Sequence, residues 1–86
     1  MHKPGRFFIV EGGQEAYLIY EMTSGKIDIQ HTLTPESLRG MGLAEALTRA
    51  AYEYAQKKGL KVIPTCSYVR EYFLKKHPEF EKISGK

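Results

Sequence analysis

The amino-acid sequence predicts an α/β (α+β) fold of order βββαβα, an antiparallel meander with a parallel β-α-β unit at its edge. Three observations indicate it. Apolar residues alternate with a period of two in the N-terminal part, they recur at helical spacing after Pro35, and a short apolar run follows that helix. Because a helix separates this run from the strand before it, a right-handed crossover makes the two strands parallel.

The N-terminal part of the chain contains the meander. Residues 6–10 are rich in β-branched and aromatic side chains, and residues 15–22 alternate in polarity; a glycine-containing turn follows each. A third strand, residues 27–33, places four side chains on one face by the two-residue period: Ile27, Ile29, His31 and Leu33. We therefore expect His31 to lie among core side chains.

The C-terminal half contains two helices and one short strand. The first helix has apolar residues at helical offsets, and Gly59 ends it. Residues 60–63 form the strand, and Pro64 ends it. Ser67 begins a last helix, which His77-Pro78 terminates, and residues 79–86 are expected to form a loose tail.

Length, charge and cysteine content limit the class of protein. A chain of 86 residues has room for one domain, residues 1–86, and its formal charge of +3 favours anionic ligands without choosing among them. Cys66 has no partner for an internal disulfide, and no Cys and His cluster predicts a metal site. The chain has no signal peptide and no apolar run of about 20 residues, so we expect a soluble cytoplasmic protein.

A glycine-containing loop, Arg39-Gly40-Met41-Gly42, joins the third strand to its helix. Glycines let the backbone approach a ligand, the first N–H groups of the helix point outward, and Arg39 adds a positive charge, all of which suit a pyrophosphate. The other interpretation is that Gly40 and Gly42 only permit a turn and close helix packing. The residues of the loop leave both interpretations open.

This loop, with His31-Thr32 before it and Ile63-Pro64-Thr65-Cys66-Ser67-Tyr68 after it, resembles the GNAT superfamily of acetyltransferases. The resemblance is to its minimal single-domain branch of short acetyl-CoA-binding proteins and covers residues 16–78. Ser37 departs from the fuller loop pattern, which has Gln or Arg at that position. The resemblance implies a truncated GNAT-like fold, without the paired helices and closing strands that enclose the acceptor in larger members.

Acetyl-CoA is the substrate that the resemblance implies. Its pantetheine arm would lie between the strand ending at Leu33 and the strand ending at Ile63, with the thioester pointing towards Cys66. The implied binding residues are His31, Thr32, Leu33, Arg39, Gly40, Met41, Gly42, Leu43, Ala44, Glu45, Cys66 and Ser67.

Cys66, His31 and Tyr68 are the candidate catalytic residues. Cys66, which the resemblance implies as a nucleophile, precedes a helix start that favours a thiolate, but it could equally be a small packed hydrophobe. His31 could relay a proton or be a satisfied core histidine. Tyr68 could donate a proton to the departing CoA thiolate or serve packing.

The leading functional hypothesis is an enzyme, an N-acetyltransferase-like protein that moves acetyl from acetyl-CoA to an unidentified amine on a small molecule or protein, through acetyl-Cys66. One alternative is an acyl-CoA-binding module without turnover. The other, less favoured, is a small RNA-binding domain that uses positive charge and exposed aromatic side chains of a sheet. No membrane or metal partner is expected, and the chain is predicted to be a monomer or weak dimer.

Overall fold

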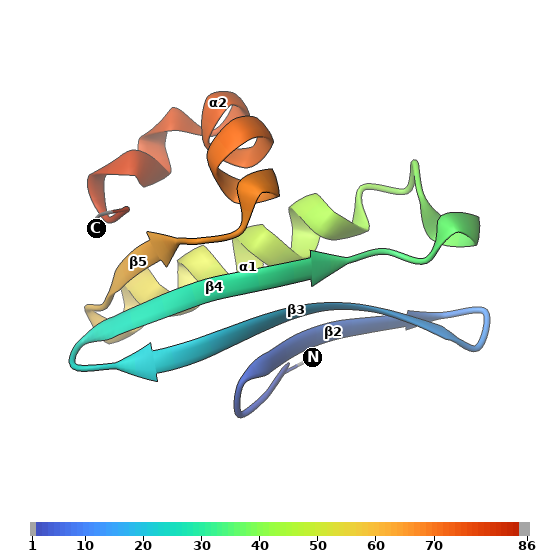
Figure 1. The fold of residues 1–86 in the computed structure, drawn as a ribbon, viewed down its shortest axis with the longest axis horizontal. Helices are drawn as coiled ribbons and strands as arrows, with labels where there is room; N and C mark the ends of the chain where they lie inside the picture. The colour runs from blue at the N-terminus through green and yellow to red at the C-terminus, as the bar shows by residue number, and fades with distance from the viewer. Residues whose placement is uncertain (1, 85–86) are drawn as a thin grey trace.

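A computed structural model describes residues 2–84 and arranges five strands in one sheet, in the order β1-β2-β3-β4-β5 (Figure 1). The strands are β1 (His2–Lys3), β2 (Arg6–Glu11), β3 (Gln14–Thr23), β4 (Lys26–Leu33) and β5 (Lys61–Pro64). Strands β1 to β4 pair antiparallel, whereas β4 and β5 pair parallel. The predicted meander and its parallel edge are therefore confirmed. The short β1 was not predicted, because two exposed residues carry no periodic signal.

The two predicted helices are present: α1 (Leu43–Lys58), and a second helical segment made of the π-helical turn η2 (Val69–Phe73) and α2 (Leu74–Lys76). The short 3-10 helices η1 (Glu36–Leu38) and η3 (Pro78–Lys82) were not predicted. α1 lies along one face of the sheet, and α2 contacts η2 and η3 (Figure 1). The buried stripe of α1 contains Leu47, Ala51 and Ala55, four residues apart, as an amphipathic helix requires. Gly59 ends α1 in a left-handed conformation and donates its N–H to the carbonyl of Gln56.

β4 contains an irregularity that the sequence period does not predict. Ile19 of β3 pairs with His31, but its neighbour Tyr20 pairs with Ile29, so Gln30 has no cross-strand partner. One extra residue in one strand is a β-bulge, and it moves every following side chain to the opposite face of the sheet. The face on which a residue of β4 lies therefore changes at Gln30.

The prediction that His31 shares a face with Ile27 and Ile29 is wrong for this reason. Ile27 and Ile29 are fully buried beneath α1, whereas His31 is exposed. Its pairing with Ile19 puts it on the face of the sheet away from α1. The bulge also turns Thr32, whose partner is the fully buried Leu18, towards the α1 side.

The expectation of a loose tail from Glu79 is also wrong as far as Ser84; residues 85–86 lie outside the described residues. Phe80 of η3 is only 5% exposed, and its ring packs 5.0 Å from that of Tyr52. The Tyr52 hydroxyl lies 2.6 Å from Ser84 Oγ, and Ser84 forms a bridge with Val62 of β5. The segment has no apolar period that predicts this packing, because one aromatic ring supplies most of it.

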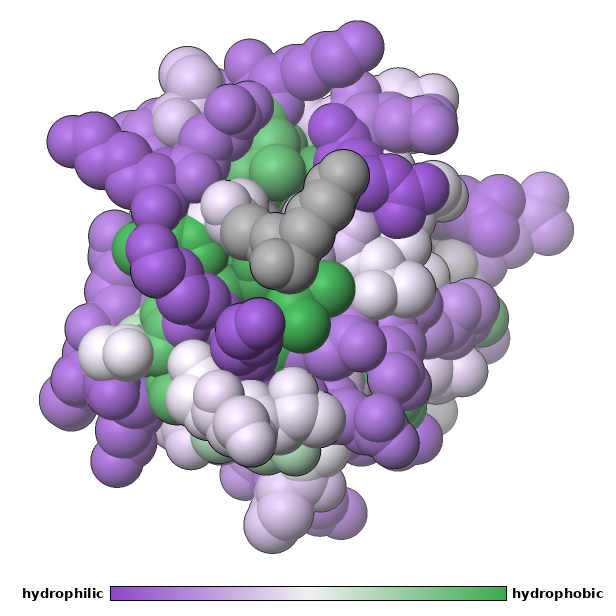
Figure 2. All heavy atoms as spheres, turned by 60° about the vertical axis from the view of Figure 1, so that its left-hand side comes forward, coloured by the Kyte–Doolittle hydropathy of each residue, from purple (hydrophilic) through white to green (hydrophobic). Residues whose placement is uncertain are grey.

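The two ends of the molecule differ in character. The end at which β5 begins is mostly hydrophilic, with hydrophobic side chains showing between the polar ones near the middle of the view (Figure 2). α1 begins at the other end, where the glycine loop follows β4 (Figure 1). Within residues 2–84, no helix has the length and apolar character needed to cross a membrane.

Candidate functional site

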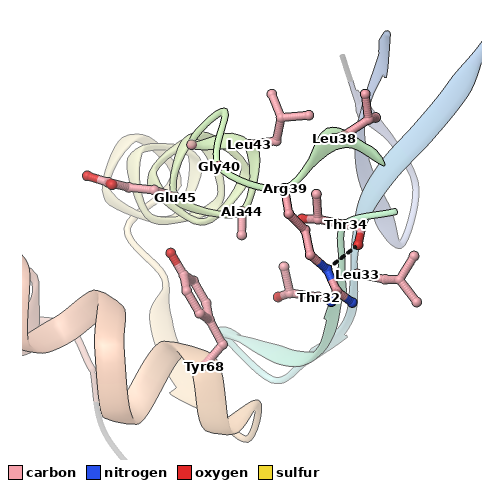
Figure 3. A pocket seen from close by; sticks show the side chains of 11 residues that line it. Thr32, Leu33, Thr34, Leu38, Arg39, Gly40, Leu43, Ala44, Glu45 and Tyr68 are labelled. Carbon is pink, nitrogen blue, oxygen red and sulfur yellow. Dashed lines mark hydrogen bonds between the residues drawn. The ribbon is translucent and has the colours of Figure 1, made fainter. Parts of the chain in front are cut away.

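A groove of about 410 Å³ lies where β4 ends and α1 begins (Figure 3). This volume falls within the range of small-molecule sites. The end of β4, η1, the glycine loop, the first turn of α1 and one tyrosine line the groove: Thr32, Leu33, Thr34, Leu38, Arg39, Gly40, Gly42, Leu43, Ala44, Glu45 and Tyr68. Most residues implied by the resemblance are thus brought together. Thr34 and Leu38 were not predicted. Thr34 lies in no recognised motif, and Leu38 lies between Ser37 and Arg39 in the loop but was not taken as a binding residue.

The glycines of the loop are required by backbone conformation. Gly40 has φ of 86° and Gly42 has φ of 74°, a left-handed region that is costly for other residues. A Cβ added at either position would meet no atom within 4 Å among the described residues. The two glycines therefore permit a turn, as one interpretation has it, but the close helix packing that it also expected is absent, and the space beside them is open.

The start of α1 presents backbone donors at this end of the groove. Gly42 is the N-cap and has no side chain to satisfy them, and the first intrahelical bond runs from the Ala46 N–H to the Gly42 carbonyl at 3.0 Å. The N–H groups of Leu43, Ala44 and Glu45 consequently have no intrahelical acceptor. Together with the helix dipole, such donors bind phosphate groups.

Arg39 and Thr34 add further polar groups. The Arg39 Nε donates to the carbonyl oxygen of Thr34 at 3.3 Å, and Figure 3 shows its side chain extending from the loop towards the end of β4. The Thr34 hydroxyl oxygen is buried and has no hydrogen-bond partner among the described residues. A buried hydroxyl without a hydrogen-bond partner costs free energy. A ligand that forms a hydrogen bond with the Thr34 hydroxyl would remove this cost and so bind more tightly.

Tyr68 and Glu45 both line the groove, on the side where α1 begins. Figure 3 shows the Tyr68 ring pointing towards the first turn of α1. Burial first, and then the charges of Glu45 and Cys66, raise the pKa of the Tyr68 phenol. This phenol therefore remains a hydrogen-bond donor at neutral pH.

Glu45 is itself held by the C-terminal segment. His77, whose side chain is only 14% exposed, has Nε2 at 2.6 Å from the Glu45 carboxylate and Nδ1 at 3.3 Å from an Arg49 nitrogen. The hydrogen bond from His77, followed by the positive charge of Lys76, lowers the pKa of Glu45. The carboxylate of Glu45, which lies in the first turn of α1, is therefore paired with His77 and Lys76. Sequence reasoning took His77 only as a helix stop, because its partner is 32 residues away.

Cys66 lies on a tightly held turn after β5. Its N–H donates to the Ile29 carbonyl at 2.9 Å, and its half-buried Sγ lies 3.6 Å from the Thr32 hydroxyl oxygen. The Arg70 guanidinium donates to the carbonyl of Pro64 at 3.1 Å and to that of Thr65. Cys66 does not line the groove, but it contacts Thr32, which does.

Besides Cys66, three predicted residues lie outside the groove. The His31 ring is on the other face of the sheet, 6.4 Å from the ring of Tyr17. It is neither a core histidine nor a side chain of the groove, because the bulge reverses its direction. Met41 and Ser67 are exposed and do not line the groove either.

Large apolar side chains are exposed around the groove. Leu33 lines it and is 38% exposed, Met41 lies between the two loop glycines and is 55% exposed, and Tyr72 is 64% exposed. The Tyr72 ring stacks on that of Tyr68 at 6.0 Å. Exposed apolar groups gathered in one place are typical of a binding surface.

Comparison with known proteins decides the family. The profile of the GCN5-related N-acetyl-transferase family matches residues 6–83. The chain belongs to this family. The solution structure of a GCN5-like protein from Staphylococcus aureus superposes with a TM-score of 0.70 at 24% identity, covering 99% of this chain and 85% of that one. This likeness shows that the two proteins share a fold.

Among vertebrate relatives in this N-acetyltransferase family, Protein NATD1 of Xenopus tropicalis is 39% identical over 64 residues, and NATD1 of Homo sapiens has the same identity over the same length. Each match covers 73% of this chain, but only 58% of the frog protein and 56% of the human one. The chain thus spans little more than half the length of these relatives.

Acetyl-CoA is the substrate typical of the N-acetyltransferase family, and three features of the groove suit a ligand that carries phosphate groups. The open loop and free helix donors suit a pyrophosphate, Arg39 supplies positive charge, and the buried Thr34 hydroxyl lacks a partner. No group of three His, Cys, Asp or Glu side chains in the described part of the chain could hold a metal ion.

Proposed function

We propose that this protein binds acetyl-CoA in the groove and transfers the acetyl group to an amine, through a thioester on Cys66. One observation carries the proposal: the groove joins the uncapped start of α1 at one end to Thr32, which contacts the only cysteine of the chain, at the other. Arg39 and the first N–H groups of α1 would hold the pyrophosphate. The β4 end, residues 32–34, would line the acyl arm.

Two exchanges make up the proposed reaction. In the first, the Cys66 sulfur bonds to the acetyl carbonyl carbon, the bond from that carbon to the CoA sulfur breaks, and the thiol proton ends on CoA. In the second, a neutral amine forms a C–N bond to the same carbon, the Cys66 sulfur leaves, and the amine proton returns to it or to water. The two steps together conserve atoms and charge.

The Tyr68 phenol would donate a hydrogen bond to the departing sulfur in the first exchange, since it lines the groove and its pKa is raised by burial. No step is assigned to the His31 side chain, because it points away from the groove. The amine acceptor is proposed by family membership alone.

A second candidate function is acyl-CoA binding without turnover. The half-buried state of Cys66 and its absence from the groove lining favour it. A cysteine in such surroundings frequently serves packing.

Intact mass spectrometry after incubation with acetyl-CoA distinguishes these functions. Wild type and Cys66→Ala are incubated, washed and weighed, and thermal unfolding of both is recorded with and without acetyl-CoA. The proposal expects stabilisation of both proteins and a gain of about 42 daltons on the wild type alone, removable by hydroxylamine.

Each other outcome has a definite meaning. Stabilisation without acetylation of Cys66, but with acetylation of an added amine, indicates direct transfer. Stabilisation without acetylation of Cys66 or of any amine indicates a binding module. The absence of stabilisation by acetyl-CoA overturns the proposed use of the groove.

A further inference from the structure

The bulge at Gln30 determines which hydroxyl faces the cysteine. With an uninterrupted period of two, Thr32 would lie on the face opposite Ile27 and Ile29, away from α1. The skipped pairing at Gln30 instead puts Thr32 on the α1 side, directly opposite the fully buried Leu18. The bulge thereby brings the Thr32 hydroxyl to the edge where β4 and β5 separate.

β4 and β5 pair only as far as Ile29 and Pro64, so the end of β4 has no β5 neighbour. Cys66 lies in this gap, anchored by its N–H on the Ile29 carbonyl. Its Sγ lies 3.6 Å from the Thr32 hydroxyl oxygen, within hydrogen-bond range for sulfur. Thr32 is half-buried and lines the groove, so it connects the ligand space with the thiol.

We propose that Thr32 is a positioning residue for Cys66, whose hydroxyl holds the thiol in one orientation towards the groove and donates a hydrogen bond to its thiolate. The inference deepens the proposed function and rests on it for its role in acetyl transfer. The hydroxyl can do both, since it accepts from S–H in the thiol state and rotates to donate when the sulfur is charged.

Other charged and titratable groups near Cys66 come from several elements. Arg70 of η2 bonds to the Pro64 and Thr65 carbonyls, and Asp28 of β4 accepts a hydrogen bond from the Thr65 hydroxyl at 2.5 Å. The Tyr68 phenol responds to the charge of Cys66. Among the described residues, Thr32 is the side chain whose hydrogen bond reaches the sulfur itself.

The test measures alkylation of Cys66 by iodoacetamide as a function of pH, in wild type, Thr32→Val, Thr32→Ser and Thr65→Val. Valine keeps the shape of threonine, suits a strand and removes the hydroxyl, whereas serine retains it. Thr65→Val is the matched control, because it removes a neighbouring hydroxyl that bonds to Asp28. Circular dichroism verifies that each variant is folded, and Thr32→Ala replaces Thr32→Val if the latter is not.

We expect iodoacetamide to alkylate Cys66 about tenfold more slowly in Thr32→Val than in wild type at the same pH, wherever on the profile the rate is still rising with pH, because the thiolate loses a hydrogen bond. Thr32→Ser and Thr65→Val should keep the wild-type profile. A wild-type profile in Thr32→Val, or a shift of equal size in Thr32→Ser or Thr65→Val, overturns the proposal.

Alkylation needs no acetyl-CoA, so this result is separate from the fate of the proposed function. If Cys66 is never acetylated but the Thr32→Val profile shifts, the pairing of hydroxyl and thiol stands and the nucleophile assignment fails. The opposite result is also possible: Cys66 is acetylated in wild type, and Thr32→Val shows the wild-type rate of acetylation and the wild-type alkylation profile. The role of Thr32 then fails, and the proposed function stands.

Discussion

Replacing Gly42 by alanine tests whether the glycine loop binds a ligand or only forms a turn. Gly42 has φ of 74°, and Gly25, in the turn between β3 and β4, has φ of 75°. A Cβ at either position would meet no atom within 4 Å among the described residues. The two substitutions therefore impose the same backbone strain with no packing clash, which makes Gly25→Ala a matched control far from the groove.

The cost of each substitution follows from the backbone alone. A left-handed conformation costs a non-glycine residue about 1–2 kcal/mol. For a domain of this size, about 1 kcal/mol corresponds to a fall of roughly 4–8 °C in Tm. Without ligand, we expect Gly42→Ala and Gly25→Ala to lose stability by similar amounts.

The two variants should differ once acetyl-CoA is added. A ligand at 100 times its Kd stabilises the folded state by about 2.7 kcal/mol. Gly25→Ala should keep the full ligand-induced rise in Tm, whereas the methyl group of Gly42→Ala occupies space beside the helix donors and should remove most of it. Thermal unfolding over a range of acetyl-CoA concentrations measures both. Equal ligand-induced shifts in the two variants would refute the assignment of this loop to phosphate binding.

Two further predictions concern the C-terminal segment. Phe80→Ala should lower the free energy of unfolding by about 3–5 kcal/mol in urea titration, because it empties a buried aromatic site, while the exposed Lys82→Ala changes it little; a loose tail would make both neutral. The hydrogen bond from His77 is the main cause of the lowered pKa of Glu45, so the folded state binds fewer protons than the unfolded one. The stabilisation is therefore present above the ordinary value of 4.5 and is lost as pH falls through the folded pKa. The stability difference between wild type and Glu45→Gln should shrink as pH falls below 4.5, and a constant difference would contradict the contact with His77.

Much of the fold could be predicted because its signals are local. The alternation over residues 15–22 and the helical spacing of apolar residues from Leu47 to Ala55 each predict which face of the element is buried. Gly59 predicts the end of α1 because glycine readily adopts the left-handed conformation found there. The glycine loop was found in the same way, since its conformation depends on the residues that compose it. The turn that contains Cys66 was recognised through its resemblance to known proteins.

Other parts of the site depend on contacts between distant residues. The partner of Glu45 is His77, and Tyr52 bonds to Ser84, each 32 residues apart. Thr34 was missed because no local pattern predicts that its hydroxyl is buried beside the groove. No period or motif encodes such contacts.

The sequence by itself determined the order of the main strands and helices, the family resemblance and the position of the glycine loop, because each depends on residues near one another in the chain. Only the tertiary structure decided which side of β4 faces Cys66. A bulge at Gln30 arises from pairing with β3, and it exchanged the expected positions of His31 and Thr32. Register between strands is a property of two segments together, so neither segment alone could specify it.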